Sequence, residues 1–420
     1  MKKFKNTFIV IALLTVSGFV AFYGLLRLRE ERLWPFNSGL SKILPPSFKQ
    51  FAYNMTNPDH KVVGSFLYNI DVAYYRIPDP GAVGGGGAIN NIGSRKLLVT
   101  LNNGQSLLFD KETGKFITIE SGEVKKIYSS VRDVFAFEKN GNKYLAFWGT
   151  TNQVSGCKRI SIYTAQYALS DSGANLSVET PTKLWETQDA CAAPVDNNAG
   201  GRIVYQEGKF YVSTGFFMGG GDLGSTPYLA LRSDSSFGKV IEVDWSGRSQ
   251  IISSGHRNPQ GLFFARSGTV LFSTEHAMRG GDELNIVRKS ANYGFPCEAY
   301  GTFYGYEFGS PQKETKLADK NPSCVGRKFD APNFYWPEKT GISQGIQYTA
   351  DEFHAFNGNL LIGSLSSTSL YRIELGEAHN VMFIERINLQ ERVRDLNFSE
   401  DGKILVLTDG GSILVLSSTR

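Results

Sequence analysis

The chain is organised around residues 255–296, a stretch that contains three sequence motifs. They read Gly255-His-Arg-Asn-Pro-Gln-Gly261, then Glu275-His-Ala-Met-Arg-Gly-Gly-Asp-Glu-Leu-Asn285, and finally Asn292-Tyr-Gly-Phe-Pro296. A short strand-like run, Thr269–Ser273, separates the first two motifs. No other segment gathers so many polar, charged and glycine residues between strand-like runs. The stretch predicts two well-ordered loops of a large β protein.

The side chains of these loops also indicate a ligand. His256, Arg257 and Asn258 offer charged and amide donors beside a proline and a glycine that favour a turn. Glu275, Asp282, Glu283 and the carbonyls of the turn offer hard oxygen ligands of the kind that calcium takes. A basic pair beside an oxygen-rich loop suggests an anionic ligand that is held partly through a metal. Two ordered loops without any ligand are the alternative.

Bulk properties of the chain favour an all-β protein. Its 420 residues allow between one and three domains. The 45 glycines and 13% aromatic residues favour turns and strands over helices, and few windows show a sustained helical period. The net charge of +4 is close to balance, so nothing indicates a nucleic-acid partner.

Short β runs divided by turns follow one another from Val62 onward. Hairpin signals join several of them, namely Asn102-Asn-Gly104, Asn140-Gly-Asn142, Asp401-Gly402 and Asp409-Gly-Gly411. Repeated hairpins over such a length predict a β-propeller, in which radial repetition leaves few exposed edges. The repeat is too irregular to count the blades.

Residues 297–340 interrupt this rhythm with a segment rich in glycine, proline, tyrosine and charge, which predicts a long loop insertion. Two of the four cysteines, Cys297 and Cys324, bracket most of it. The simplest pairing is Cys157–Cys191 and Cys297–Cys324, because each bridge then closes a local loop. Four free thiols are the alternative.

The N-terminus predicts a membrane anchor. Lys2, Lys3 and Lys5 precede an uncharged apolar run, Phe8–Leu26, which is long enough to span a bilayer as a helix. A cleaved signal peptide is the alternative, although no good small-residue cleavage site follows. Both interpretations place the main domain outside the cytoplasm, on the periplasmic side. The predicted organisation is an anchor over residues 1–32, a linker over 33–60 and a propeller over 61–420.

The three central motifs resemble the signature of the soluble quinoprotein sugar dehydrogenases. This family includes glucose dehydrogenase, aldose sugar dehydrogenase and the glucose/sorbosone dehydrogenase domain. Three motifs in the same order as in the family, at close spacing, are more specific than one short motif. The resemblance implies a six-bladed β-propeller that binds pyrroloquinoline quinone (PQQ) and calcium and oxidises the anomeric carbon of an aldose. It leaves the sugar and the electron acceptor open.

The resemblance also assigns residues to the cofactor. Arg257 and Asn258 match the family's Arg-Asn pair beside PQQ, and Arg392 and Arg394 match an Arg-x-Arg-Asp segment that binds the cofactor's carboxylates. The alternative for the last two is a strand-edge salt bridge to Glu391 or Asp395.

For calcium, the resemblance implies two groups of ligands. The carbonyls of Ala277 and Met278 take the place of the family's Gly-Pro, which helps to hold the cofactor's calcium. Asp282, Glu283 and Tyr293 match a calcium-binding loop.

The chain departs from the family at the catalytic base. The family's His-x-Gly-Gly-Arg reads Asn198-Ala-Gly-Gly-Arg202, so Asn198 stands where the histidine would be. An amide cannot accept a proton at neutral pH, and general base catalysis is typically worth about 10²–10⁴-fold. Asp196 lies two residues away and is the best substitute base; a turn or cap residue is its alternative.

Other cofactor contacts also differ. The family's Gly-Asp-x-Gly reads Gly215-Phe-Phe-Met218, its Gly-Ser-Leu-Lys reads Gly363-Ser-Leu-Ser366, and no first-blade cofactor segment is recognisable around Ala88–Thr100. Two functions are therefore predicted. One is a PQQ- and calcium-dependent aldose dehydrogenase, and the other is a redox-inactive propeller that binds a sugar, a glycan or a protein partner.

Overall fold

The computed structural model describes residues 60–78, 86–119, 122–151, 159–170, 173, 175–187, 198–216, 226–266, 268–302 and 324–419. The chain divides into two compact units, residues 1–61 and 62–420, and the second contains the fold. Within the described ranges, no helix is long and apolar enough to cross a membrane. The predicted anchor at Phe8–Leu26 lies outside the described residues, as does all but the last residue of the predicted linker.

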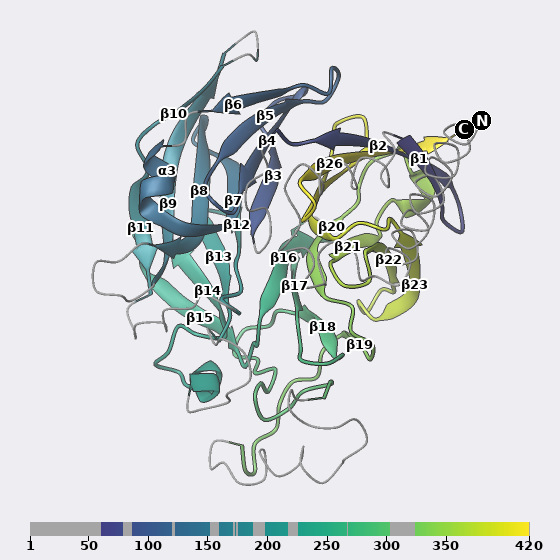
Figure 1. Ribbon diagram of the computed structural model, residues 1–420. Helices are drawn as coiled ribbons and strands as arrows, with labels where there is room; N and C mark the ends of the chain where they lie inside the picture. Colours follow the sequence, from purple (N-terminus) through teal and green to yellow (C-terminus); the bar gives the residue numbers. More distant parts are fainter. Residues whose placement is uncertain are drawn as a thin grey trace, which may run out of the picture. The chain divides into compact units, whose positions relative to one another are not determined.

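The fold is all-β, a six-bladed β-propeller (Figure 1). The first sheet contains β3 (Gly87–Asn91), β4 (Lys96–Leu101), β5 (Ser106–Asp110) and β6 (Phe116–Ile119). The second contains β7 (Tyr128–Lys139), β8 (Asn142–Thr151), β9 (Arg159–Leu169) and β10 (Leu176–Val178), with β11 (Thr182–Glu186) also paired to β9. The third contains β12 (Arg202–Gln206), β13 (Lys209–Thr214), β14 (Lys239–Asp244) and β15 (Ser249–Ser254).

The remaining sheets complete the propeller. The fourth contains β16 (Pro259–Ala265), β17 (Val270–Glu275), β18 (Asp282–Ile286) and β19 (Phe334–Trp336). The fifth contains β20 (Ile342–Gln347), β21 (Leu360–Ser364), β22 (Ser369–Leu375) and β23 (Val381–Asn388). The sixth contains β24 (Val393–Phe398), β25 (Ile404–Thr408), β26 (Ser412–Thr419), β2 (Asn69–Arg76) and β1 (His60–Gly64). Helix α3 (Gly122–Ile127) and the 3₁₀ turns η2 (Thr226–Leu231) and η3 (His354–Phe356) connect strands.

The first strand of each sheet in ring order, β3, β7, β12, β16, β20 and β24, contacts the next one, and β24 returns to β3. The sixth sheet closes the ring with both ends of the propeller's chain. Its strand β2 pairs with β26 from Asn69 opposite Thr419 to Arg76 opposite Ser412. This pairing covers the backbone edge that the last repeat would otherwise expose.

The predicted hairpins are confirmed where the structure describes them. Asn140 and Gly141 join β7 to β8 with φ angles of 52° and 77°, which is the left-handed pair that a tight hairpin turn requires. Asn is among the few residues other than glycine that adopt such a φ readily, so the turn is encoded locally.

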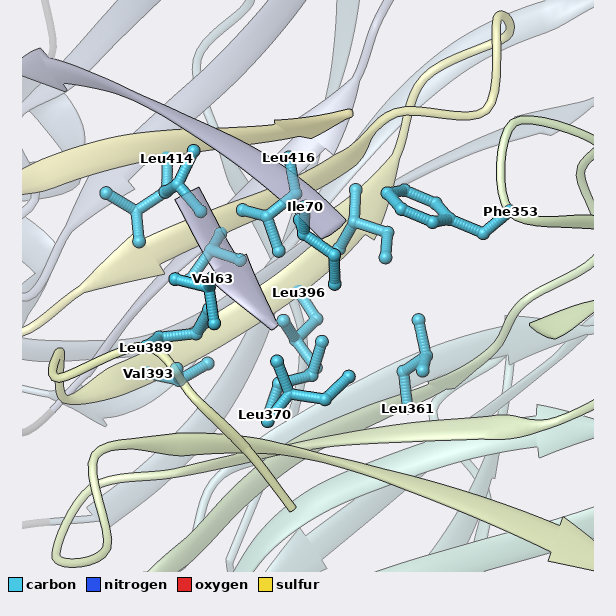
Figure 2. Close-up of a cluster of buried hydrophobic side chains, with 14 of the residues drawn as sticks. Val63, Ile70, Phe353, Leu361, Leu370, Leu389, Val393, Leu396, Leu414 and Leu416 are labelled. Carbon is cyan, nitrogen blue, oxygen red and sulfur yellow. The ribbon is translucent and has the colours of Figure 1, made fainter. Parts of the chain in front are cut away.

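A cluster of apolar side chains fills the space between the fifth and sixth sheets (Figure 2). Ile70 of β2, Leu370 of β22 and Leu414 of β26 are all completely buried in it. The cluster therefore joins the first strands of the propeller to its last ones, and closure of the ring depends on apolar packing as well as on backbone pairing.

Replacing Ile70 with alanine should test this closure. We expect Ile70→Ala to lower the free energy of unfolding by about 2–5 kcal/mol, because it leaves a cavity in a completely buried cluster. Urea denaturation followed by circular dichroism would measure the change. Val62→Ala is a matched control, since Val62 lies nearby in β1 but is 64% exposed. Equal effects of the two substitutions would contradict the packing role.

The predicted disulfide between Cys297 and Cys324 is present, with 5.4 Å between its Cα atoms. Cys157 and Cys191 lie outside the described residues. Within the predicted insertion at 297–340, residues 334–336 form β19, the outer strand of the fourth sheet. A strand of three residues is too short to show an alternating pattern, which is why the sequence did not indicate it.

Candidate functional site

Polar and charged side chains gather where the inner strands meet, in the part of the fold that apolar residues would otherwise fill. They come from four blades: Asp133 from β7, Arg202 from β12, Gln260 from β16, and Arg394 and Asp395 from β24. Buried polar groups need hydrogen-bond partners, so the arrangement of this set decides what the site can bind.

Arg202 is the centre of this buried network. Its Nη1 lies 3.2 Å from Oδ1 of Asp133 and 3.0 Å from Oδ1 of Asp395. Its Nε donates to the carbonyl oxygen of Gln260 at 2.8 Å, and its Nη2 to that of Arg394 at 2.9 Å. One guanidinium therefore connects β12 with β7, β16 and β24.

The two carboxylates extend the network through the backbone. Asp133 accepts a hydrogen bond from the amide of Ile203 at 2.9 Å, and Asp395 accepts one from the amide of Ile89 in β3 at 2.7 Å. Five of the six inner strands are thus linked around one cation. Both carboxylates are occupied by protein donors, which indicates a structural role for this trio.

The charges of the trio do not balance. Two buried carboxylates face one guanidinium, so one negative charge remains in excess. Burial and the neighbouring charge of Asp395 together raise the pKa of Asp133 to about 7, despite the opposing charge of Arg202. Burial likewise raises the pKa of Asp395. The pair therefore holds one proton more readily than isolated aspartates would.

This proton makes a testable contribution to stability. The pKa of Asp133 is about 7 in the folded state, whereas its ordinary value is 3.8. Between these two pH values, the folded protein keeps a proton on Asp133 that the unfolded chain has released. Stability from this group is therefore present at low pH and is lost as the pH rises toward 7, with a slope of at most about 1.4 kcal/mol per pH unit. We expect wild type to lose stability relative to Asp133→Asn between pH 5 and pH 7.

Urea denaturation at several pH values would measure that difference. The substituted amide places an N–H group near the amide of Ile203, which costs stability at every pH and does not alter the slope. A constant difference between the two proteins across this pH range would contradict the raised pKa of Asp133.

A second cationic group lies on the last blade. Arg394 donates to Asp409 from Nε at 2.7 Å and from Nη2 at 3.0 Å, while Arg392 donates to Oδ2 of the same carboxylate from Nε at 3.1 Å and from Nη2 at 3.0 Å. Although burial would raise it, the two guanidiniums hold the pKa of Asp409 below its usual range. Two cations thus share one carboxylate, and a positive charge remains.

This pairing corrects one alternative from the sequence. The alternative was a strand-edge salt bridge to Glu391 or Asp395, whereas both arginines form their ion pairs with Asp409, just after the end of β25. The side chain of Arg392 is 30% exposed, whereas that of Arg394 is 7% exposed. The excess charge is therefore accessible through Arg392.

Gln260 connects the arginine pair to the position of the family's base. Its Oε1 accepts from Nη1 of Arg394 at 3.3 Å, and its Nε2 donates to Oδ1 of Asn258 at 2.9 Å. Asn258 in turn donates from Nδ2 to Oδ1 of Asn198 at 3.2 Å and accepts from the amide of Gly200 at 3.1 Å. The structure therefore brings Asn198, Asn258 and Arg394 into one hydrogen-bonded chain.

Asn198 lies in a tight turn before β12. Its φ is 55° and that of Gly200 is 68°. A Cβ on Gly215, across the turn, would come within 2.0 Å of the carbonyl oxygen of Asn198, so glycine is required there. Asp196, the predicted substitute base, lies outside the described residues.

Arg257 is fixed between two loops. Its backbone amide donates to Oε2 of Glu275 at 2.7 Å, and its Nη1 donates to the carbonyl oxygens of His276, at 2.9 Å, and of Ala277. Its guanidinium carbon lies 5.4 Å from the centre of the Phe216 ring. The first two motifs of the central stretch, residues 255–261 and 275–285, therefore contact each other at this arginine.

The side chains of Asp282 and Tyr293, two of the predicted calcium ligands, form hydrogen bonds within the protein. Oδ1 of Asp282 accepts from the amide of Ala277 at 2.9 Å, and Oδ2 accepts from the hydroxyl of Thr340 at 3.0 Å and from the amide of Gly341. Both oxygens thus hold loops together. The hydroxyl of Tyr293 donates to the carbonyl of Ile286.

Glu283 is a buried acidic residue of this loop. Burial, together with the nearby charge of Glu275, raises its pKa well above the usual range, although a hydrogen bond from Asn285 at 3.1 Å opposes this. Among the residues that the structure describes, no group of three or more His, Cys, Asp and Glu side chains could hold a metal ion. Both side-chain oxygens of Asp282 are used within the protein, and calcium binding at this loop stays a prediction.

Two residues of the site had a weak signal in the sequence and one had none. Arg202 ends the Gly-Gly-Arg segment and Asp409 follows β25, yet neither had an assigned partner. Asp133 lies inside the long strand β7 with no motif around it. Burial and the charges of Arg394 and Arg257 lower the pKa of His276, although Asp282 opposes this, so His276 lies within the field of both cations.

The fold and the site define a class, a six-bladed β-propeller with a cationic polar site at its inner strands. Comparison with known proteins identifies the family: the sequence model described as Glucose / Sorbosone dehydrogenase matches residues 88–415. The chain belongs to the glucose/sorbosone dehydrogenase family.

Relatives agree with this assignment. Aldose sugar dehydrogenase YliI of Escherichia coli is 30% identical over 232 residues, which covers 51% of this chain and 58% of that protein. Quinoprotein glucose dehydrogenase B of Acinetobacter calcoaceticus is 23% identical over 410 residues, covering 76% of this chain and 84% of that one. The chain spans about half the length of the first two curated relatives it matches, 58% and 46%.

Solved structures share the fold. The apo form of the soluble aldose sugar dehydrogenase of E. coli has a TM-score of 0.64 at 21% identity, covering 83% of this chain and 99% of that one. The PQQ-bound aldose sugar dehydrogenase of Streptomyces coelicolor has a TM-score of 0.58 at 18% identity, covering 85% and 100%.

Proposed function

We propose that this chain is a PQQ-binding aldose sugar dehydrogenase of the glucose/sorbosone dehydrogenase family that acts outside the cytoplasm. The observation that carries the proposal is the excess positive charge of Arg392 and Arg394 on the single carboxylate of Asp409. Family membership, and the PQQ named for one solved relative, support the choice of ligand. When bound, PQQ supplies the acceptor for the hydride that leaves the sugar.

The donor set fits a polycarboxylate. PQQ carries carboxylates on a rigid planar frame, and the planar fork of arginine binds carboxylates in two-point geometry. Arg392 is partly exposed and would bind one carboxylate, while Arg394, held by Asp409 and Gln260, keeps the charge in place. Asn258 and Gln260 would orient polar edges of the ligand. Calcium stays a prediction from the family resemblance, and no step is assigned to it.

The proposed chemistry depends on a proton acceptor. Oxidation of a sugar hydroxyl requires a group that takes the hydroxyl proton as hydride leaves carbon. Asn198 stands at the family's base position and its side-chain oxygen accepts from Asn258, so it can align a hydroxyl group but cannot hold its proton. Asp196 remains the predicted substitute.

This observation favours the second candidate function, a propeller that binds a sugar or a glycan without oxidising it. Restoring the base separates the two candidates. We expect Asn198→His to raise sugar-dependent dye reduction by about 10²–10⁴-fold if the ligand site is intact. Histidine tolerates the positive φ of this position better than most residues do.

Asn197→His, one residue earlier, is the matched control and should not change the rate. A rate that Asn198→His leaves unchanged, in a protein that binds PQQ and oxidises sugar, would show that the base lies elsewhere and would direct attention to Asp196→Asn.

The direct test of the proposed function uses purified protein, PQQ and an aldose panel. Saturable binding of PQQ, measured by absorbance, followed by sugar-dependent reduction of a redox dye would support the dehydrogenase. Binding of PQQ without turnover would support the redox-inactive alternative. An absence of PQQ binding would contradict both the ligand and the role of the arginine pair.

The location outside the cytoplasm rests on the apolar run Phe8–Leu26. We propose that this run anchors the domain, as its length and basic N-terminal flank predict. Fractionation of cells that express the full chain, with protease added to intact spheroplasts, would test this. Recovery of the intact chain in the soluble cytoplasmic fraction would contradict it.

A further inference from the structure

A chain of side-chain amides runs from a buried arginine to the position of the family's base. Nη1 of Arg394 donates to Oε1 of Gln260 at 3.3 Å, and Nε2 of Gln260 donates to Oδ1 of Asn258 at 2.9 Å. Nδ2 of Asn258 then donates to Oδ1 of Asn198 at 3.2 Å. Arg394 and Asn258 are buried, whereas Asn198 is partly exposed, so the chain ends at a residue that a ligand can reach.

Two groups that can only donate fix the direction of this chain. Turning an amide side chain by 180° exchanges its oxygen and its nitrogen, so the hydrogen-bond partners decide which atom lies where. The backbone amide of Gly200 donates to Oδ1 of Asn258 at 3.1 Å, and a backbone N–H group cannot accept. A guanidinium has no acceptor either, so Arg394 fixes Oε1 of Gln260 in the same way. Asn258 must therefore turn its Nδ2 toward Asn198.

This direction determines what Asn198 offers to a ligand. Because its oxygen is turned toward Nδ2 of Asn258, its own Nδ2, which carries two N–H donors, lies on the other branch of the amide. The turn is held in place, since the amide of Gly215 donates to the carbonyl of Ala199 at 2.7 Å. A ligand oxygen beside the amino group of Asn198 therefore meets N–H donors, whereas a base would present a lone pair to it.

We propose that Asn198 determines specificity, so that the site prefers a sugar with a carbonyl group at its anomeric carbon, an aldono-1,5-lactone, over the aldose itself. The inference rests on the proposed function for the placement of the anomeric carbon beside Asn198. A carbonyl oxygen only accepts, so it matches the N–H donors, whereas the hydroxyl group of an aldose has to turn its own proton away from them. The lactone is the two-electron oxidation product of the aldose, so the site favours the oxidised sugar.

Isothermal titration calorimetry of the full chain, with and without PQQ, tests this preference. The ligand pairs are D-glucose with D-glucono-1,5-lactam and D-galactose with D-galactono-1,5-lactam, because a lactam resists hydrolysis and keeps the carbonyl group of the lactone. We expect at least one lactam to bind about 3- to 10-fold more tightly than its aldose, which corresponds to one hydrogen bond. Equal affinities within both pairs, tighter binding of the aldoses, or no binding of any of the four ligands would overturn the proposal.

A nearly isosteric substitution makes the test specific for Asn198. Asn198→Asp keeps the hydrogen bond from Asn258 and replaces the N–H donors with an acceptor oxygen, and aspartate tolerates the φ of 55° at this position. We expect this variant to bind the aldose more tightly than the lactam. Asn142→Asp, exposed at the hairpin between β7 and β8, adds the same charge and should keep the preference of wild type.

A second variant covers the case in which Asn198→Asp does not fold. Asn198→Gly removes the whole amide and is compatible with a positive φ. Lactam and aldose should then bind with equal affinity. A preference for the lactam that survives in Asn198→Gly would show that another residue selects the carbonyl group.

Failure of the proposed function is distinguishable from failure of this inference. If the lactam is preferred and PQQ does not bind, the quinone is wrong and the specificity of Asn198 stands. If PQQ binds and the aldose is oxidised, but Asn198→Asp leaves the preference unchanged, the dehydrogenase stands and the role of Asn198 is overturned.

Discussion

Arg202→Met is expected to lower the free energy of unfolding by about 3–5 kcal/mol, which for many domains is a large part of the total. Removing the guanidinium leaves Asp133 and Asp395 facing each other without a counter-charge. It also leaves the carbonyl groups of Gln260 and Arg394 without their donor. Since the trio links five inner strands, the loss should affect the whole ring. Urea denaturation followed by circular dichroism would measure it.

Arg248→Met is the control, because the side chain of Arg248 is 85% exposed and its pair with Asp244 should contribute little. A second test adds Asp133→Asn and Asp395→Asn to Arg202→Met. Removing all three charges together should recover part of the lost stability, because the unpaired charges cause most of the cost. A loss below about 1 kcal/mol for Arg202→Met alone would contradict the structural role of the trio.

Arg394→Gln should weaken PQQ binding by about 100-fold, the second large effect that we expect. Its guanidinium is buried, donates twice to Asp409 and contacts Gln260, so its loss removes a desolvated charge and leaves Asp409 to neutralise Arg392 fully. The site would then carry no excess positive charge for a carboxylate. Absorbance titration of PQQ would measure the change.

Arg392→Gln provides a graded comparison, because this arginine is partly exposed and donates to the same carboxylate. Arg248→Gln, far more exposed, should leave the dissociation constant unchanged. A dissociation constant within threefold of wild type for Arg394→Gln, in a protein that still folds, would show that the ligand does not use this arginine pair.

Much of the fold could be predicted from local patterns. The turn at Asn140-Gly141 is encoded by residues that adopt positive φ, and the runs on either side of this hairpin signal were correctly predicted as strands. Six blades were expected from the family resemblance rather than from the repeat itself. The outer strand β19 was missed because three residues carry no periodic signal.

The candidate site was predicted only in part. The motifs named Arg257, Asn258, Arg392 and Arg394, and the structure joins the last three through Gln260 and Asp409. The motifs did not indicate how these residues are used. Asp282 resembles a calcium ligand in sequence, yet its oxygens are occupied by backbone amides and by Thr340.

Residues close together in the chain were enough to predict the class of fold, the family motifs and the presence of Asn198 at the family's base position. The partners of the charged groups became known only from the folded protein. Arg202 meets Asp133 and the carbonyl of Arg394 across separations of 69 and 192 residues. A single sequence carries no local signal for such pairs, since ring closure brings the blades together and burial then requires each charge to have a partner.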